Sequence, residues 1–343
     1  MIKNGKFYLL LTLLTAGALV LLPLTTLPVA SEPAAAPVAA KPAVPAATSV
    51  TTAATARPDI RTETFSVLHS DGETVSQIAV RDFLLYTLAA EMLPSFGEEA
   101  LKAQVVASYT YFCYERDLER ENPTEALHGA DFADTPVAYP EGYAADYWVK
   151  KWGQKNYDDA FARLTAAVDA VAGVQMRYEG KPIFAAYHAI SSGTTELPEV
   201  VWASAFPYLQ SVDSELDREA PDYETAVRLT NDEFRKKVAG VNGIELSGDP
   251  AGWIGDEVTR SAAGTVLRMV VGGVALTGRE CRTLFGLRSA CFSVAYESGG
   301  FTFTVHGHGH GVGMSQYGAA WLAQQGASYE EILHHYYTDI EIV

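Results

Sequence analysis

Turn signals in the second half of the chain limit the folds that it can adopt. The pairs Glu179-Gly180 and Gly272-Gly273 each separate two short runs rich in strand-forming residues. Such pairs favour the tight turns of β-hairpins, in which consecutive strands run antiparallel. A parallel sheet would instead need strands that alternate with crossover helices. The pattern therefore predicts an α+β fold with helices packed on antiparallel strands and hairpins.

Helix starts are marked by a serine or threonine that is followed three residues later by glutamate, which is a capping box. These starts are Ser95, Thr230, Thr277 and Ser328. Another helix is expected over 82–91, because Pro94 cannot continue it. An amphipathic helix is expected over 157–171, whereas 128–153 shows no periodicity and is expected to be irregular.

The first 58 residues differ in composition from the rest of the 343-residue chain. After Lys3 and Lys6, residues 7–30 carry no charge, which is long enough to span a bilayer. We expect residues 1–30 to be an uncleaved membrane anchor, with a removed signal peptide as the alternative. Residues 31–58 are rich in Ala and Pro and predict a disordered spacer. Residues 59–343 should then form the folded body outside the cytoplasm.

Charge and cysteine content exclude some classes of protein. The formal net charge is -17, so we do not expect a nucleic-acid partner, because such binding rests on basic surfaces. The three cysteines, Cys113, Cys281 and Cys291, show no metal-like spacing. Cys281 and Cys291 could form a disulfide, or all three could be buried thiols.

Glu91 is the first candidate for chemistry, because it follows Leu84 and Leu88 on one helical face. A carboxyl at the inward end of an apolar stripe is partly desolvated, which raises its pKa towards the value that a general acid needs. The alternative is a glutamate that only caps the helix end or faces solvent.

Two polar segments are further candidates. Residues 187–196, YHAISSGTTE, suit a loop close to a polar ligand, although a polar turn explains them as well. His306, His308 and His310 alternate with glycine, so on a strand they would share one face and could bind zinc. The alternative is a glycine-rich wall of an active site, in which Ser315 caps the next helix.

Three strings resemble the stage II sporulation protein D family. They are AEMLPSFGEEALKAQ at 90–104, FAAYHAISSGTTELPEVVWASAFPYLQSV at 184–212 and GHGVGMSQYGAAWLAQQG at 309–326. The resemblance extends over most of the chain from residue 77 onward. It implies a lytic transglycosylase that acts on the glycan strands of peptidoglycan.

The resemblance places the family's catalytic glutamate on Glu91, although Leu93 is inserted before Pro94 of the motif. It implies that Glu91 protonates the bond between N-acetylmuramic acid and N-acetylglucosamine, and that a 1,6-anhydro sugar forms. It also implies a long substrate cleft with Glu91 at its floor and no cofactor. The residues expected to bind substrate are Tyr187, His188, Ser191, Gly193, His310, Gly311, Ser315, Gln316 and Gln104.

This sequence departs from the family pattern in two places. Where many relatives read A-R-T-Y, it has Ser108-Tyr109-Thr110-Tyr111, so any contact of that arginine is lost or replaced. Some relatives hold zinc with a histidine and cysteines, but Ala133 stands here where a cysteine would be needed. We therefore expect no metal.

The resemblance further implies a role at the sporulation septum during engulfment, on the mother-cell side of the membrane. Its implied partners are stage II sporulation proteins P, an amidase, and M, together with glycan strands that lack stem peptides. The main alternative is a non-catalytic amidase enhancer that binds glycan or an enzyme. A zinc hydrolase based on the three histidines is a more distant one.

Overall fold

The computed structural model describes residues 59–134 and 145–343, and Arg57–Val343 form one compact unit. The mixture of helices and small sheets confirms the α+β class. The expected anchor over 1–30 and spacer over 31–58 lie outside the described residues. In the part of the chain that is described, no helix has both the length and the apolar character to cross a bilayer.

The folded chain begins with a β-hairpin that leads directly into a helix. Strands β1 (Thr64–Leu68) and β2 (Val75–Ala79) pair antiparallel, with Thr64 opposite Ala79. Helix α2 (Val80–Glu91) starts at the residue after β2 and ends where Met92 turns to an extended conformation. The expected helix over 82–91 is thus confirmed, two residues longer at its start.

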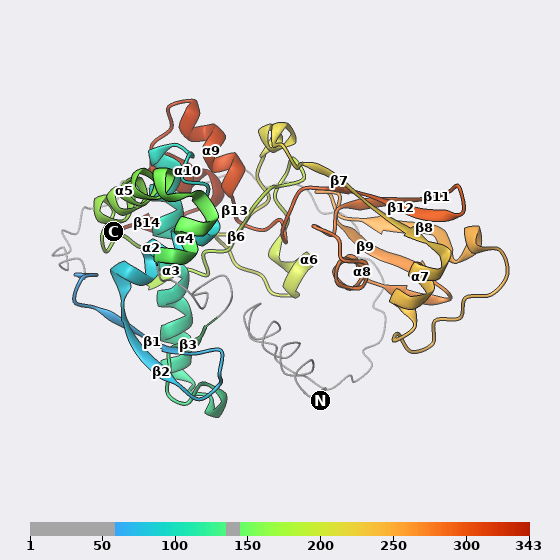
Figure 1. Cartoon of the computed structure of the whole chain (residues 1–343), viewed down its shortest axis with the longest axis horizontal. Helices are drawn as coiled ribbons and strands as arrows, with labels where there is room; N and C mark the ends of the chain where they lie inside the picture. Colours follow the sequence, from blue (N-terminus) through green and yellow to red (C-terminus); the bar gives the residue numbers. More distant parts are fainter. Residues whose placement is uncertain (1–58, 135–144) are drawn as a thin grey trace, which may run out of the picture. The chain divides into compact units, whose positions relative to one another are not determined.

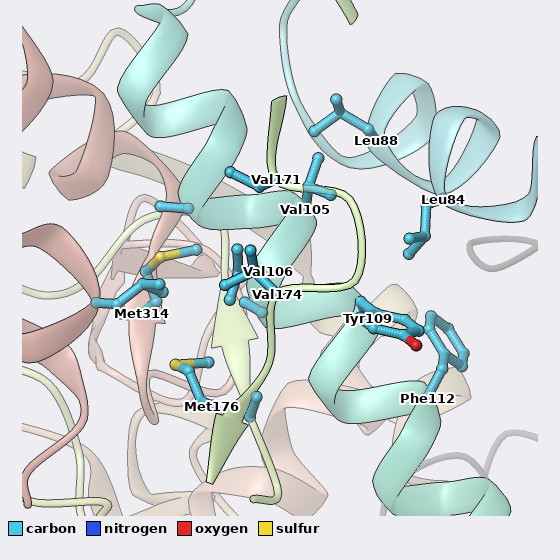
Figure 2. Packing of buried hydrophobic residues seen from close by; sticks show 14 of the residues in the cluster. Leu84, Leu88, Val105, Val106, Tyr109, Phe112, Val171, Val174, Met176 and Met314 are labelled. Atoms are coloured by element: carbon cyan, nitrogen blue, oxygen red, sulfur yellow. The ribbon is translucent and has the colours of Figure 1, made fainter. Parts of the chain in front are cut away.

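Helix α3 (Glu98–Glu121) is the centre of the helical part, and the other long helices pack on it (Figure 1). These are α2, α5 (Gln154–Ala170), α9 (Gln316–Gln324) and α10 (Tyr329–Tyr336). Figure 2 shows Leu84 and Leu88 of α2 among the core residues around α3, with Met314 reaching the same core from a distant segment. Leu84 and Leu88 are each 1% exposed, and each contributes about 1.5–3 kcal/mol by its burial.

The expected capping box at Ser95 is wrong. The residue that precedes α3 is Gly97, and no side chain caps this end. The carboxylate of Glu98 instead forms a 2.6 Å ion pair with Lys102 one turn later, so it does not reach back to the backbone at Ser95. The capping boxes at Thr230, Thr277 and Ser328 are confirmed.

The expectation of an irregular segment over 128–153 is wrong in part. Helix α4 (Ala145–Trp152) lies within it and packs on α5. Trp148 is fully buried, and its ring lies 4.7 Å from that of Trp152. The two rings are four residues apart and so share one face of this short helix, which they stabilise by tertiary contacts. Strand β3 (Phe132–Ala133) pairs with β1, and residues 135–144 lie outside the described part.

The hairpin at Glu179-Gly180 is confirmed, although its strands are shorter than expected. Strand β4 (Met176–Tyr178) pairs with β5 (Lys181–Pro182), and both turn residues have positive φ, as a type I′ turn requires. The strand-forming run that follows this turn is divided into β5 and a second short strand, β6 (Tyr187–His188). A short C-terminal strand, β14 (Glu341–Ile342), completes this sheet on β4.

Residues 224–306, which we call the sheet lobe, have a hydrophobic core of their own. One sheet contains β8 (Ile254–Arg260), β9 (Val266–Val271) and β10 (Val274–Leu276), all antiparallel. The other contains β7 (Glu224–Thr230), β11 (Phe292–Glu297) and β12 (Gly300–His306). Helices α7 (Asn231–Val238) and α8 (Gly278–Phe285) supply Phe234 and Phe285, whose rings stack 5.2 Å apart.

The cysteines are free thiols. Cys113 and Cys281 are buried and Cys291 is half-buried, so the alternative of a disulfide between Cys281 and Cys291 is not what the structure shows. Cys281 lies in the core of the sheet lobe.

Candidate active site

Glu91 is the last residue of α2 and is half-buried. Its helix is held by Leu84 and Leu88, which are buried on the same face, as the sequence predicted. The N–H of Met92 donates to the Leu88 carbonyl at 2.9 Å and closes the helix, after which the chain turns away. The carboxyl therefore projects from a rigid helix end.

A hydrogen-bonded chain of side chains supports this carboxyl. Gln316 Nε2 donates to Glu91 Oε2 at 2.9 Å and to Gln104 Oε1 at 3.3 Å. Gln104 Nε2 donates to Ser108 Oγ at 3.0 Å. Tyr187 forms side-chain hydrogen bonds to both Ser108 and Glu91, which closes the chain into a ring of five residues. We call these residues the Glu91 network.

Burial is the main cause that raises the pKa of Glu91 to about 7. The hydrogen bonds from Gln316 and Tyr187 oppose this effect, because they favour the carboxylate. A carboxyl with such a pKa exists in both protonation states near neutral pH. It can donate a proton and take one back at the same position.

Short parallel strands bring two distant segments together at this site. Strand β13 (Met314–Ser315) pairs with β6, so that Met314 lies opposite Tyr187 and Ser315 opposite His188. Ser315 Oγ accepts the N–H of Gly318 at 3.2 Å and caps α9, as the sequence predicted. Because α9 begins at Gln316, the cap fixes the residue that binds Glu91.

His188 belongs to β6, and the centre of its ring lies 5.8 Å from that of His310. His188 is buried, and its Nδ1 donates to the Val312 carbonyl at 3.1 Å. His310 Nδ1 accepts the N–H of the same residue at 3.1 Å. Burial lowers the pKa of His188 to about 4 and that of His310 to about 3, so both rings are neutral at pH 7. The His188 contact therefore ties the two segments together, and His310 does the same through a hydrogen bond to the backbone of Tyr187.

Asp217 is a site residue that the sequence did not suggest. It is fully buried in a 3₁₀ turn (Glu215–Glu219) and accepts the Ser191 N–H at 2.8 Å and the Ser214 hydroxyl at 3.0 Å. Burial raises the pKa of Asp217 to about 6. Ser191 Oγ in turn accepts the Gly193 N–H at 3.2 Å. The buried Asp217 carboxyl therefore holds the loop over 187–196 in place from the protein interior.

Gly193 and Gly311 occupy positions that a side chain would disturb. Gly193 has φ of 110°, and a Cβ there would lie 2.7 Å from Arg218 Nε. Gly311 has φ of 83°, and its carbonyl accepts the Glu196 N–H at 2.7 Å. Both glycines therefore serve the packing of the polar loop.

A pocket of 200 Å³ opens beside Glu91. Of the expected site residues, Glu91 and Gln316 line it, and Gln104 and Tyr187 join it through the Glu91 network. His188, Ser191, Gly193, His310, Gly311 and Ser315 are not among its lining residues. Sequence reasoning missed the aromatic lining, which is Phe96, Trp152 and Tyr317. The aromatic Trp152 was hidden because α4 was not expected.

The two departures from the family strings have different consequences. Ser108 belongs to the Glu91 network. Tyr109 is fully buried against Phe65 on the side of β1, and its hydroxyl donates to Glu63 Oε2 at 2.7 Å. Arg116 pairs with the same carboxylate at 2.7 Å. Tyr109 therefore stabilises the β1 side of α3 and does not belong to the Glu91 network.

The histidine run does not form the strand face that a zinc site would need. Only His306 is in β12, where its Nε2 lies 3.1 Å from Glu224 Oε2, and Gly307 then takes φ of 74°. Within residues 59–134 and 145–343, no group of three or more His, Cys, Asp or Glu side chains is placed to hold a metal. Near Ala133, Asp131 binds Arg120 at 2.8 Å and the Ser66 N–H at 2.9 Å.

Comparison with known proteins shows which proteins this chain is similar to. The family model described as stage II sporulation protein matches residues 69–178. The chain is 34% identical to stage II sporulation protein D of Bacillus amyloliquefaciens over 277 residues, which is 80% of this chain and 77% of that relative. It is 32% identical to stage II sporulation protein D of Bacillus subtilis, over 80% of this chain and 78% of that relative. An amidase enhancer of Bacillus subtilis is 26% identical over 72% of this chain and 38% of that protein.

The two matches to stage II sporulation protein D define a class of sporulation proteins, and each covers most of both chains. The chain belongs to the stage II sporulation protein D family.

Proposed function

We propose that this protein is a lytic transglycosylase of peptidoglycan and that Glu91 is its acid and base. One observation carries the proposal: among the described residues that line the pocket, Glu91 is the single carboxyl group, and its pKa is about 7. Glycoside hydrolases use two carboxyl groups about 5–10 Å apart, because one must activate a water or form a covalent adduct. A reaction with an internal nucleophile needs only one.

The proposed reaction balances with this single group. Protonated Glu91 gives its proton to the glycosidic oxygen, and the bond from that oxygen to C1 of N-acetylmuramic acid breaks. The 6-hydroxyl of the same sugar attacks C1, and its proton returns to Glu91. A 1,6-anhydro sugar and a free N-acetylglucosamine hydroxyl result, and no water is consumed.

The Glu91 network orients the carboxyl for these two steps. The Gln316 amide donates a hydrogen bond to Oε2 of Glu91. This amide is itself held in place, because the same nitrogen also contacts Gln104. Only small changes of hydrogen bonding are then needed as Glu91 changes charge. Trp152 and Tyr317 give the pocket aromatic walls, which suit the apolar faces of a sugar ring.

The pocket volume favours recognition of a short stretch of glycan at the point of cleavage. At 200 Å³ it is smaller than pockets for drug-sized ligands, which measure about 300–1,000 Å³. We infer that it holds one sugar ring beside Glu91, while the remaining strand lies on the surface.

A non-catalytic function is the second candidate, because one relative is named an amidase enhancer. In that function the pocket would bind glycan without cleavage. The raised pKa of Glu91 argues against it, because a binding site gains nothing from a carboxyl held near half-ionisation.

The cellular role follows from the family and is part of the proposal. The substrate would be septal peptidoglycan without stem peptides, and the body would act outside the cytoplasmic membrane from an anchor at residues 1–30. Stage II sporulation proteins P and M would be its partners. Co-purification of the full chain with each of them tests that part.

Mass spectrometry of isolated glycan strands tests the reaction. Strands without stem peptides are incubated with the full-length chain in detergent, with Glu91→Gln, and with Glu98→Gln as a matched control on the exposed start of α3. We expect anhydromuramic ends from the wild type and the control, and a loss of about 10²–10⁴-fold for Glu91→Gln. Reducing ends would indicate a hydrolase. Intact strands with a folded wild type would favour the enhancer.

A further inference from the structure

A row of aromatic side chains continues from the Glu91 network along α3. Gln104 and Ser108 of the network share one helical face with Tyr111 and Glu115, because the four positions follow the spacing of helical turns. Ser108 to Glu115 spans about 10 Å along the helix axis, which is longer than one pyranose ring. This face leads away from the pocket without leaving the helix that organises it.

The rings on this surface form a contiguous set. Phe184 lies at its centre, 5.6 Å from Tyr111, 5.6 Å from Tyr114, 5.3 Å from Trp202 and 5.0 Å from Phe206. Phe184 is 6% exposed, whereas the four rings around it are half-buried. We call these five residues the aromatic platform. The four half-buried rings also pack against the main hydrophobic core, which fixes their positions.

Two sets of contacts join the platform to the Glu91 network. Trp202 lies 4.9 Å from the His310 ring, and His310 is hydrogen-bonded to the backbone of Tyr187. Tyr111 is close enough to the Tyr187 hydroxyl to raise its pKa, as Glu91 also does. The platform is therefore joined to the Glu91 network by packed side chains.

Glu115 adds a polar group at the far end. It is half-buried near Tyr111 and Tyr114, both of whose pKa values it raises. Among the described residues, no cation or hydrogen-bond donor pairs with Glu115. Burial raises the pKa of Glu115 to about 7. A half-buried carboxyl without a partner is costly to the fold and suits a ligand that brings donors.

We propose that the aromatic platform and Glu115 form a second saccharide subsite, which holds the glycan strand beyond the ring bound at Glu91. The ring faces carry negative charge density and attract the C–H bonds of a pyranose, while Glu115 accepts hydrogen bonds from hydroxyl or acetamide groups. This inference rests on the proposed function for its ligand.

Binding to uncut strands tests the platform apart from cleavage. The full-length chain carrying Glu91→Gln is titrated with long glycan strands and with a disaccharide, both without stem peptides. Trp202→Ala or Phe206→Ala, added to this chain, should weaken binding of long strands by about tenfold and leave the disaccharide unaffected. Trp202→Phe should restore most of the affinity, because it keeps a ring.

Two further variants guard against misfolding. Glu115→Gln keeps the shape of the side chain, and it should weaken long-strand binding while the melting temperature at neutral pH is no lower than that of the parent protein. Tyr296→Ala is the matched control, because this half-buried ring packs 5.0 Å from Phe301 in the sheet lobe. Equal affinity of folded Trp202→Ala, Phe206→Ala and Glu115→Gln for long strands would overturn the inference.

The cleavage assay separates this inference from the proposed function. With the catalytic glutamate present, Trp202→Ala should raise KM for long strands about tenfold with little change in kcat. If Trp202→Ala forms anhydromuramic ends with the KM of the wild type, the proposed function stands and the platform is refuted. If the wild type makes no such ends, the titration still decides the platform. If the platform variants bind glycan normally but no longer co-purify with a protein partner, the saccharide assignment is overturned.

Discussion

Replacing Glu91 by glutamine should stabilise the fold, and the gain should depend on pH. The carboxyl has a pKa of 4.5 in the unfolded chain and about 7 in the fold. Between these values the folded protein holds a proton that the unfolded chain has released. The free energy of unfolding of the wild type therefore falls as the pH rises through this window, and the loss is complete above pH 7.

The magnitude follows from the two pKa values. Each pKa unit corresponds to about 1.36 kcal/mol, so ionised Glu91 costs at most about 3 kcal/mol in the fold. The side chain borders an open pocket, and water there screens the charge, so we expect about 1–2 kcal/mol. Glutamine can still accept the hydrogen bond from Gln316 but cannot ionise, so Glu91→Gln avoids this cost.

Thermal unfolding followed by circular dichroism between pH 4.5 and 8.5 measures the effect. The two proteins should melt together at the acid end, and Glu91→Gln should melt roughly 3–6 °C higher at pH 8.5. Glu98→Gln is the control of opposite sign, because the pair with Lys102 lowers the pKa of Glu98, and its removal should slightly destabilise the protein above pH 5. The assignment of a buried, costly carboxyl would be refuted if the difference in melting temperature between the two proteins did not change with pH, or if Glu91→Gln melted below the wild type at pH 8.5.

Three further predictions follow from particular contacts. Gln316→Ala removes a donor that favours the Glu91 carboxylate, so the pKa of Glu91 should rise and the alkaline limb of the profile of kcat/KM against pH should move to higher pH; an unchanged limb would show that this contact does not tune the acid. Gly313→Ala would place a Cβ against the Ala186 carbonyl beside β6, so we expect loss of at least 3 kcal/mol of stability in urea unfolding, whereas Gly326→Ala, with open space around it, should lose about 1 kcal/mol. Tyr109→Phe should cost about 1 kcal/mol through one lost hydrogen bond and leave the rate of anhydromuramic product formation unchanged; a large loss of rate would place this residue in the site after all.

Local signals predicted the parts of the fold that local chemistry determines. The Thr230 and Thr277 caps and the Glu179-Gly180 turn involve residues at most three positions apart, and all three are found. The Ser95 cap failed because Glu98 had a better partner in Lys102. Helix α4 was missed although Trp148 and Trp152 have helical spacing, because eight residues are too few to establish a period.

The candidate site shows the same division. Glu91 could be found from its helical face, and Gln316 was placed in the site only by the family strings, whereas the hydrogen bond between the two was not predicted. Asp217 could not have been found, because its role comes from contacts with Ser191 and Ser214 that depend on tertiary structure. The one available signal was an acidic residue soon after the second family string, which is too common to predict a function.

The pairing of β6 with β13 also has a consequence for the synthesis of the protein. His188 and Val312 touch across 124 positions of sequence, and the intervening sheet lobe has its own core. Closing a longer loop adds only about 0.6 kcal/mol for each doubling of its length, so this lobe can gain or lose residues at small cost. Gln316, however, reaches Glu91 only after the ribosome has passed the whole lobe. A nascent chain therefore carries the acid long before it carries the network that makes the acid useful.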